Sequence, residues 1–506
     1  MSLAIVYSRA SYGITSPLVT VEVHLSNGLP SFTVVGLAET AVKESRERVR
    51  SALKNSGFEF PTRRITVGLA PADLPKRGGR FDLPIAVGIL VAAGQLSADV
   101  LRGVEYCAEL GLGGELRQVD GILPAVVAAT TAGRTIVLAP HNLAEAGLVR
   151  SANLLAAPDL TALVDHLTGV HVIEHTAAPP VVESPSHVSL VEVRGQPVAR
   201  RAIEVAAAGG HGLAMVGPPG CGKSMLATRL PALLPKMSDA QGLETAMVYS
   251  LAGKTRPPSA LLTRPFRAPH HSITAAALIG GGRLPRPGEI SLAHNGVLFL
   301  DELTEFSRSV LEQLREPLES GAIMVARDNH SLHFPCRFQL IAAMNPCPCG
   351  YYGDMGNECR CSTAQLQRYR SKVSGPMLDR IDLQVQVSPV SATDLVRRDT
   401  TDGDGRCIVQ RVAVAQEIQS ARNECANADL TPEAIAKVCV LDSGAQELLE
   451  KGISVLGLSA RAYHSVLRVS RTLADLANDE TVKAEQLAEA LSYRTIDRYS
   501  NTSSSF

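Results

Sequence analysis

Eight consecutive residues have the types and the spacing needed to hold a chain of phosphate groups. They fit the phosphate-loop pattern G-x-x-x-x-G-K-[ST] at every fixed position, and they are Gly217, Pro218, Pro219, Gly220, Cys221, Gly222, Lys223 and Ser224. Glycines allow a tight loop whose backbone N–H groups point at phosphate oxygens. Lys223 can then reach the β- and γ-phosphates, and the Ser224 hydroxyl can bind Mg²⁺. The pattern therefore predicts ATP and Mg²⁺ as ligands.

The residues around this loop give it the context that the pattern requires. Residues 213–216 form a short apolar run typical of a strand, and residues 225–230 are typical of the start of a helix. The alternative is a chance glycine-rich turn followed by Lys-Ser. The strand before the loop and the helix after it argue against that alternative.

Two adjacent carboxylates follow a second apolar run. Residues 296–300 suit a strand that is buried on both faces of a parallel sheet, and Asp301 and Glu302 come directly after it. The carboxyl ends of such strands are where these sheets bind ligands, so Asp301 is expected to hold Mg²⁺. Glu302 is expected to be the general base that polarises the attacking water. Without the phosphate loop, an apolar strand followed by Asp-Glu would be a weak signal.

A polar amide follows a third expected strand, over residues 338–344. Asn345 could orient the attacking water beside the γ-phosphate. An Asn before a proline is by itself more often a turn residue. Beside a phosphate loop and an Asp-Glu strand, we favour the water-orienting role.

Four of the cysteines fall close together, as C-x-C, nine residues and C-x-C: Cys347, Cys349, Cys359 and Cys361. Four thiolates can close a tetrahedral structural zinc site, which would brace the chain directly after Asn345. The usual inner spacing is C-x₂-C, so this spacing is a departure. Redox-sensitive dithiols and unliganded surface cysteines remain the alternatives.

The composition sets outer limits on the class of protein. With 506 residues the chain is long enough for about three domains. The formal net charge of −1 gives no global basic field, so a nucleic-acid partner would need a local patch or channel. The apolar runs are shorter than a membrane span, no secretion signal is evident, and cysteines are sparse. We expect a cytoplasmic protein with no membrane partner.

Local patterns divide the chain into successive parts. Strands are expected over residues 18–25, 31–35 and 64–69, and an amphipathic helix over 39–56. That helix carries a stripe of basic residues, Lys43, Arg46, Arg50 and Lys54. We favour a solvated face for this stripe over a contact with nucleic acid or another subunit. A proline-containing linker is expected over 173–190, and mainly helical sequence begins near residue 413.

Three further runs carry a resemblance to a known family. They are residues 264–271 (RPFRAPHH), 287–296 (PGEISLAHNG) and 374–382 (SGPMLDRID). With the loop and the two strand ends, they resemble the AAA+ ATPases, and within these the magnesium-chelatase-like branch that contains the YifB/ComM proteins. The resemblance covers nearly the full length. Such sequences also carry a cysteine cluster, which favours zinc.

The resemblance implies an α/β fold class, an AAA+ P-loop parallel sheet with a helical lid, preceded by a Lon-protease-like (S5-like) α+β domain. The implied domains are a Lon-like domain (1–172), the linker (173–190), an ATPase core (191–390), a helical connection (391–429), the lid (430–497) and a disordered tail (498–506). In the Lon-like domain, segments 80–88 and 114–122 lack the serine and lysine of active Lon proteases, so proteolysis is not expected. Ring assembly or DNA contact is the expected role.

The resemblance also assigns roles to two arginines. The subunits would form a hexameric ring with ATP between neighbours, and Arg380 would be the arginine finger for the next subunit's ATP. Arg461 would be a sensor on the lid, acting with its own subunit's nucleotide. Without the resemblance, Arg380 would be interpreted as part of a surface ion pair and Arg461 as an ordinary helix-surface residue.

An insert over residues 272–291 would point into the pore of the ring. Gly280, Gly281, Gly282, Arg283 and Arg286 would form a positively charged mobile loop suited to a phosphate backbone, although a merely structural loop is the alternative. His270 and His271 are more readily explained as buried or capping residues than as ligands.

The function implied is an ATPase that acts on single-stranded or branched DNA, as a ComM-like helicase that drives branch migration in recombination and natural transformation. The rival is a magnesium-chelatase-type remodeller that acts on a protein partner. A non-enzymatic Lon-like scaffold is a third class, and the complete set of hydrolytic residues argues against it.

Overall fold

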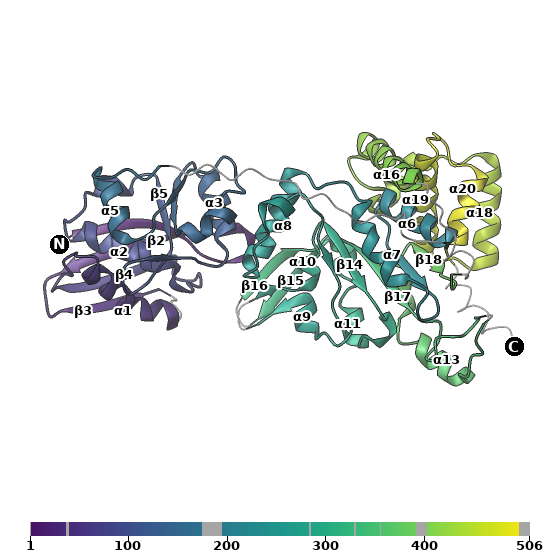
Figure 1. The fold of residues 1–506 in the computed structure, drawn as a ribbon, viewed down its shortest axis with the longest axis horizontal. Helices are drawn as coiled ribbons and strands as arrows, with labels where there is room; N and C mark the ends of the chain where they lie inside the picture. The colour runs from purple at the N-terminus through teal and green to yellow at the C-terminus, as the bar shows by residue number, and fades with distance from the viewer. Residues whose placement is uncertain are drawn as a thin grey trace. The chain divides into compact units, whose positions relative to one another are not determined.

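The computed structural model describes residues 2–36, 40–174, 195–282, 285–327, 330–354, 356–390 and 402–494 (Figure 1). The chain divides into two compact units. Unit 1 contains residues 1–184, 238–263 and 328–334, and unit 2 contains 185–237, 264–327 and 335–506. The expected tail and Arg283 lie outside the described residues, as does the expected linker except for residues 173 and 174.

Unit 1 is built on a mixed sheet of seven strands in the order β3-β4-β2-β1-β5-β8-β9. Its strands are β1 (Ser2–Arg9), β2 (Leu18–Ser26), β3 (Ser31–Val35), β4 (Arg64–Ala70), β5 (Val104–Cys107), β8 (Thr135–Leu138) and β9 (Leu154–Ala156). Along β2, buried residues alternate with more exposed ones from Val19 to Leu25, because successive side chains point to opposite faces. The three strands expected in this part of the sequence are confirmed.

The helices of unit 1 bury apolar side chains on this sheet. They are α1 (Thr40–Asn55), α2 (Asp82–Ala92), α3 (Ile122–Thr131), α4 (Leu143–Ala146) and α5 (Leu160–Thr168), and a small hairpin joins β6 (Glu109–Leu110) to β7 (Leu116–Arg117). Helix α1 confirms the helix expected over 39–56. Helix α2 is apolar almost all round and almost wholly buried, as expected for a helix inside a core.

Residues 80–88, which occupy the position of the serine-bearing turn of active Lon proteases, contribute to packing in unit 1. Arg80 is buried and donates to the backbone oxygens of Arg9 and Asp120. Asp82 accepts from Arg48 of α1, with Nε and Oδ2 2.7 Å apart. Burial raises the pKa of the Asp82 carboxyl, although Arg48 opposes this effect. These side chains therefore hold the core of the unit together.

A helix from the middle of the sequence also belongs to unit 1. Helix α8 (Asp239–Leu251) packs on α3, and the backbone N–H of Leu123 donates to the Ser250 hydroxyl over 3.3 Å. Ala246 and Leu261 are buried in the same apolar cluster as Leu123. The sequence prediction placed residues 238–263 within the segment 191–390. The structure shows that their apolar side chains complete the core of unit 1.

Unit 2 contains a five-stranded sheet in the order β11-β14-β17-β10-β18, and all neighbouring pairs are parallel. Its strands are β11 (Phe266–Arg267), β14 (Gly296–Leu300), β17 (Phe338–Met344), β10 (Leu213–Val216) and β18 (Leu383–Gln386). Every residue of β14 is buried, as expected for a strand covered on both faces. The expected strands at 213–216, 296–300 and 338–344 are confirmed, as is the α/β fold class.

Short elements surround this sheet, and α6 packs against β10 and β18 (Figure 1). The helices are α6 (Pro197–Gly209), α7 (Lys223–Arg229), α9 (Ala275–Ile279), α10 (Glu289–Leu292), α11 (Arg308–Glu312), α12 (Pro317–Ser320), α13 (Thr363–Arg370) and α14 (Gly375–Leu378). The remaining strands of unit 2 are β12 (Gly280–Gly281), β13 (Arg286–Pro287) and β15 (Ala322–Arg327), whereas β16 (His330–Pro335) belongs almost wholly to unit 1. Strands β12 and β13 pair into a hairpin within the expected insert.

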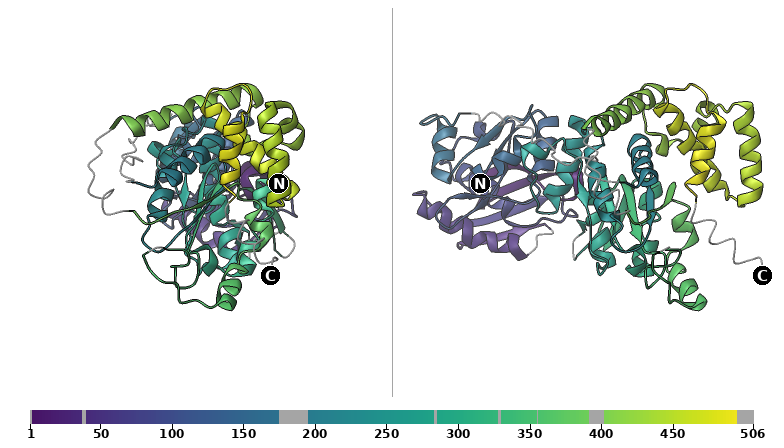
Figure 2. Two further views of the ribbon diagram at one scale, coloured as in Figure 1. Left: turned by 90° about the vertical axis from the view of Figure 1, so that its right-hand side faces the viewer. Right: turned by 45° about the vertical axis from the view of Figure 1, so that its right-hand side comes forward.

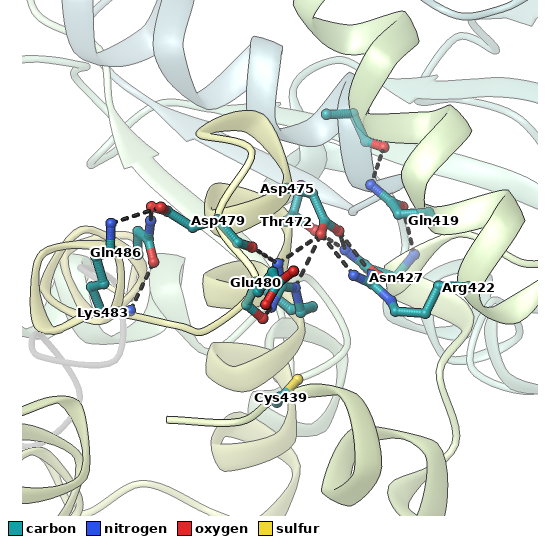
Figure 3. A network of polar contacts seen from close by, with 12 residues as sticks. Gln419, Arg422, Asn427, Cys439, Thr472, Asp475, Asp479, Glu480, Lys483 and Gln486 are labelled. Atoms are coloured by element: carbon teal, nitrogen blue, oxygen red, sulfur yellow. Dashed lines mark hydrogen bonds and ion pairs between the residues drawn. The ribbon is translucent and has the colours of Figure 1, made fainter. Parts of the chain in front are cut away.

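The last helices of unit 2 form one group (Figure 2). They are α16 (Asp402–Asn423), α17 (Pro432–Val438), α18 (Ser443–Leu456), α19 (Ala460–Leu476) and α20 (Ala484–Ser492). A buried polar network joins α16 to α19 (Figure 3). In it, Asp475 accepts from Arg422 at 2.7 and 2.9 Å, from Asn427 at 2.8 Å and from Arg471 at 3.0 Å. These bonds satisfy a carboxylate that is only 1% exposed.

Among the described residues, every helix is too short or too polar to cross a membrane.

Candidate functional site

The residues predicted to bind and hydrolyse ATP gather at one edge of the unit 2 sheet. Parallel strands end on the same side, so the residues directly after β10, β17 and β14 must meet there. The loop 217–224 follows β10, Asn345 follows the adjacent β17, and Asp301 follows β14. The register of three neighbouring strands thus brings together residues that are far apart in the sequence.

The phosphate loop wraps around the Lys223 amine. Lys223 Nζ donates to the backbone oxygens of Gly217 at 2.7 Å and Pro218 at 2.9 Å, and it lies 3.3 Å from Asn345 Oδ1. Gly220 and Gly222 have φ angles of 77° and 87°, in the left-handed region that glycine adopts without strain. Helix α7 begins at Lys223, two residues earlier than expected, so its first backbone N–H groups face the loop.

The two residues predicted to hold Mg²⁺ are in direct contact. The Ser224 hydroxyl donates to Asp301 Oδ2 over 2.7 Å. The other oxygen of Asp301 accepts from the backbone N–H of Glu302 at 2.9 Å. A hydroxyl and a carboxylate side by side form an oxygen donor set that suits Mg²⁺, which also binds phosphate oxygens and water. The residues present therefore fit the ion.

Glu302 has a partner that the sequence analysis did not identify. Its side chain is 56% exposed, and its Oε2 lies 3.0 Å from His271 Nδ1. Its backbone φ is 52°, an uncommon conformation for a residue with a side chain. The one sequence signal for this contact is the position of His271 at the end of the run 264–271, four residues after β11, the strand that pairs with β14.

The two predicted arginines share a single carboxylate. Arg380 Nη2 lies 2.6 Å from Glu319 Oε1, and Arg461 Nη2 contacts the same oxygen. Arg380 also donates to the backbone oxygen of Pro376 at 2.6 Å. The structure thus brings Arg461 to Arg380, whereas the sequence analysis grouped it with the residues of the phosphate loop. No local pattern pointed to Glu319.

Buried polar residues support the turn that carries Arg380. Asp382 accepts from His211 Nδ1 at 2.8 Å and from the Ser465 hydroxyl at 2.6 Å, and Ser465 lies one helical turn after Arg461 on α19. Arg494 donates to the Ile381 backbone oxygen at 2.9 Å. Burial alone would raise the pKa of Asp382, but the hydrogen bond and the charge of His211 bring it below the usual value. These contacts hold the turn and α19 together.

The four clustered cysteines have the geometry of a metal site. Their sulfur atoms all lie within 4.8 Å of one another, and Cys347 Sγ is 3.3 Å from Cys349 Sγ and 3.8 Å from Cys359 Sγ. Four sulfurs at a zinc–sulfur distance of about 2.3 Å would be about 3.8 Å apart. The donor set fits zinc.

This cysteine cluster lies against the phosphate loop. A Cβ added at Gly350, between the two cysteine pairs, would come within 2.6 Å of Pro219 Cδ. The backbone at Gly350, in the loop that follows Asn345, therefore lies close to Pro219 of the phosphate loop. A metal held by the cysteines would brace both.

Three family models match this chain. They are the magnesium chelatase subunit ChlI over residues 189–395, the ChlI subunit of Mg-chelatase over 21–142 and the ChlI C-terminal region over 404–494. The chain is 50% identical over 504 residues to competence protein ComM of Haemophilus influenzae, covering 98% of both chains.

More distant relatives are similar to the chain over different lengths. YifB of Salmonella typhimurium is 47% identical over 499 residues, with 98% of both chains covered. The magnesium-chelatase 38 kDa subunit of Rhodobacter capsulatus is 25% identical over 313 residues, which are 56% of this chain and 80% of that subunit. The chain therefore belongs to the YifB/ComM family of magnesium-chelatase-like AAA+ proteins.

Proposed function

We propose that this chain is the subunit of an ATP-hydrolysing ring that moves on DNA, as a helicase promoting branch migration in recombination and natural transformation. The observation that carries the proposal is that the expected catalytic residues of unit 2 lie in two separate places. The loop 217–224, Asp301, Glu302 and Asn345 meet at one sheet edge, whereas Arg380 and Arg461 contact Glu319. A second copy of the chain would bring its arginines to this edge.

Each group has a defined part in the proposed reaction. Lys223 and the backbone N–H groups of the loop bind the phosphates, and Ser224 and Asp301 would hold Mg²⁺, which would supply positive charge beside the transferred phosphoryl group. Glu302 accepts the proton of the attacking water, which Asn345 orients. Arg380 of the next subunit neutralises charge that develops on the γ-phosphate in the transition state. Because the ATP site lies between subunits, its opening and closing during hydrolysis moves neighbouring subunits relative to one another.

DNA is proposed as the substrate on two grounds. The relative that is 50% identical is a competence protein, and the resemblance to the ComM branch implies action on recombination intermediates. The insert also presents the hairpin β12–β13, and its Arg286 is exposed, as a contact with a phosphate backbone requires.

The test is the ATPase rate with and without single-stranded and branched DNA, with Glu302→Gln as a control of strongly reduced activity. We expect DNA to raise turnover, branched DNA most, and the stimulation to weaken as salt rises. The magnesium-chelatase-type alternative, supported by the matched ChlI models, predicts a rate that ignores DNA and rises with a protein partner. That result would replace our proposal.

We also propose that Cys347, Cys349, Cys359 and Cys361 hold a structural zinc. With four protein ligands the ion has no open position for a substrate, so its role is to brace the loop. Metal analysis of the purified chain is expected to give about one zinc per chain, lost in Cys359→Ser but kept in the control Cys425→Ser. Zinc well below one per chain in the wild type would contradict the site.

A further inference from the structure

A buried hydrogen bond joins the turn after β14 to helix α13. The Thr304 hydroxyl donates to the Tyr369 hydroxyl over 2.6 Å, and the two residues are only 2% and 7% exposed. They lie 65 positions apart in the sequence, so the bond fixes α13 to a distant segment of unit 2. The reaction proposed above gives this bond no part.

The turn that contains Thr304 begins at the proposed base. Glu302 comes directly before the short 3₁₀ helix η8 (Leu303–Glu305), and its backbone oxygen accepts from the Glu305 N–H at 2.7 Å. A residue with a side chain keeps a φ angle such as the 52° of Glu302 only where its surroundings hold it. Because Thr304 is inside this turn, its buried hydrogen bond helps to hold that conformation.

Helix α13 is itself fixed to the cysteine cluster. It begins two residues after Cys361, and the Ser362 side chain caps its first turn. Its last residue, Arg370, lies over the Tyr352 ring at 4.9 Å, and the Tyr352 N–H donates to Cys347 Sγ at 3.3 Å. The cysteine cluster and α13 are therefore parts of one connected piece, from which Tyr369 reaches the turn of Glu302.

A second contact joins the same two segments at the surface. Lys372 Nζ lies 3.4 Å from Glu305 Oε2 and 5.6 Å from the centre of the Tyr369 ring. Both side chains of this ion pair are 44% exposed, so water screens it and it adds little. The hydrogen bond between Thr304 and Tyr369 is buried, and it is therefore the firmer of the two contacts.

This bond can affect catalysis through the position of Glu302. A general base must lie within hydrogen-bond reach of the water that it deprotonates, and a displacement of about 1 Å is enough to slow the reaction. Without its anchor at Thr304, the turn can relax and carry the Glu302 carboxylate away from Asp301. The residues that bind the phosphates are held by other contacts, so ATP binding should not change.

We propose that Tyr369 is a positioning residue, which holds the turn of Glu302 at the sheet edge from the piece formed by the cysteine cluster and α13. This inference rests on the proposed function in that it takes Glu302 as the base. It assigns Tyr369 no contact with ATP or with the attacking water.

Conservative substitutions remove each hydroxyl in turn. Tyr369→Phe keeps the ring beside Lys372, and Thr304→Val keeps the branched shape of the side chain. The matched control is Tyr351→Phe, which removes another tyrosine hydroxyl close to the cysteines. Within the described part of the chain, that hydroxyl has no hydrogen-bond partner. Two double variants, Tyr369→Phe with Thr304→Val and Tyr369→Phe with Glu302→Gln, test whether the effects share one route.

The experiment measures kcat and KM for ATP without DNA, together with the zinc content of each variant. In Tyr369→Phe and in Thr304→Val we expect kcat to fall about fivefold, the effect of one lost neutral hydrogen bond, with KM and zinc content unchanged. Combining the two should cause no further loss, since both remove the same bond. Adding Tyr369→Phe to Glu302→Gln should also cause no further loss, and Tyr351→Phe should match the wild type.

Several results would overturn the inference while leaving Glu302 as the base. One is a wild-type kcat in Tyr369→Phe, and another is a pair of losses that multiply in the variant that also carries Thr304→Val. A fivefold loss repeated in the Glu302→Gln background would show that Tyr369 acts on another group. A fall in zinc content in Tyr369→Phe would show that its hydroxyl supports the cysteine cluster instead.

Failure of the proposed function gives a different pattern. Glu302→Gln at the wild-type rate would remove the base and the positioning role of Tyr369 together. A wild type whose turnover ignores DNA would remove the DNA substrate, but the positioning role would stand on the rates measured without DNA.

Discussion

The sheet edge and the arginine turn of unit 2 hold their charged groups in opposite ways. At the sheet edge, Asp301 and Asn345 directly follow strands and Ser224 ends the loop after β10, and these residues contact one another or Lys223. At the arginine turn, side chains from a turn and from α19 meet on the carboxylate of Glu319. The first region is complete in one chain. In the second region Glu319 pairs with both arginines, and the proposed function requires the phosphates bound by a second copy to take its place.

The largest effect is expected from Arg380→Ala. Removing an arginine finger should lower kcat by about a thousandfold, because the transition-state charge is no longer neutralised. Lys223→Ala should be inactive for a different reason, since it cannot hold ATP. An equal mixture of the two variants should recover roughly a quarter of the wild-type rate, because random assembly pairs intact halves at that frequency.

The mixing experiment has a matched control in Arg102→Ala, an exposed arginine of unit 1 that should leave the rate unchanged. If Arg380→Ala hydrolyses ATP at full rate as a single copy, or if the mixture stays inactive, then the two regions do not form a shared site.

A smaller effect is expected from Glu302→Gln. Losing a general base should lower kcat by about a hundredfold, while the amide preserves the shape of the side chain. Nucleotide affinity, measured with a fluorescent ATP analogue, should stay close to that of the wild type. Loss of binding together with turnover would show that Glu302 supports the fold of the sheet edge and does not act as the base.

Asp382→Asn tests the support of the arginine turn. Losing hydrogen bonds to a buried carboxylate should lower the free energy of unfolding by about 2 kcal/mol near neutral pH. The folded pKa of Asp382 lies below its usual value of 3.8, so its contribution is fully present above that value. The contribution is lost as pH falls through the folded pKa.

Urea unfolding at several pH values checks this expectation. The difference between wild type and Asp382→Asn should vanish in acid, while the exposed control Asp99→Asn should show no difference at any pH. A difference that persists unchanged below the folded pKa would contradict the role of the Asp382 charge.

The smallest effect is expected from Glu319→Gln. If Glu319 only competes with phosphate for the two arginines, removing its charge should lower KM for ATP by about threefold, as expected for a partly exposed ion pair. The value of kcat should not change, nor should either constant in the control Glu312→Gln, which removes a partly exposed pair with Arg315. A collapse of kcat in Glu319→Gln would mean that the carboxylate positions the arginines.

The contrast between the sheet edge and the arginine turn also explains how much of the candidate site could be predicted from the sequence. The strands β10, β14 and β17 have local apolar patterns, and the residues after them carry recognisable chemistry, so the sheet edge could be assembled by reasoning. The partners of Arg380 and Arg461 depend on how α12 and α19 pack, which no local pattern records. The contact of His271 with Glu302 likewise depends on the pairing of β11 with β14.

The place of α8 has a consequence for how this protein can be divided. Its buried Ala246 rests in a core formed mainly by residues from the first third of the chain, although α8 follows the phosphate-loop helix in sequence. Cutting the chain near residue 184 would leave an apolar helix surface bare and prone to association. The amino-terminal region is therefore not a detachable module, and a shortened chain would need its own replacement for the lost surface.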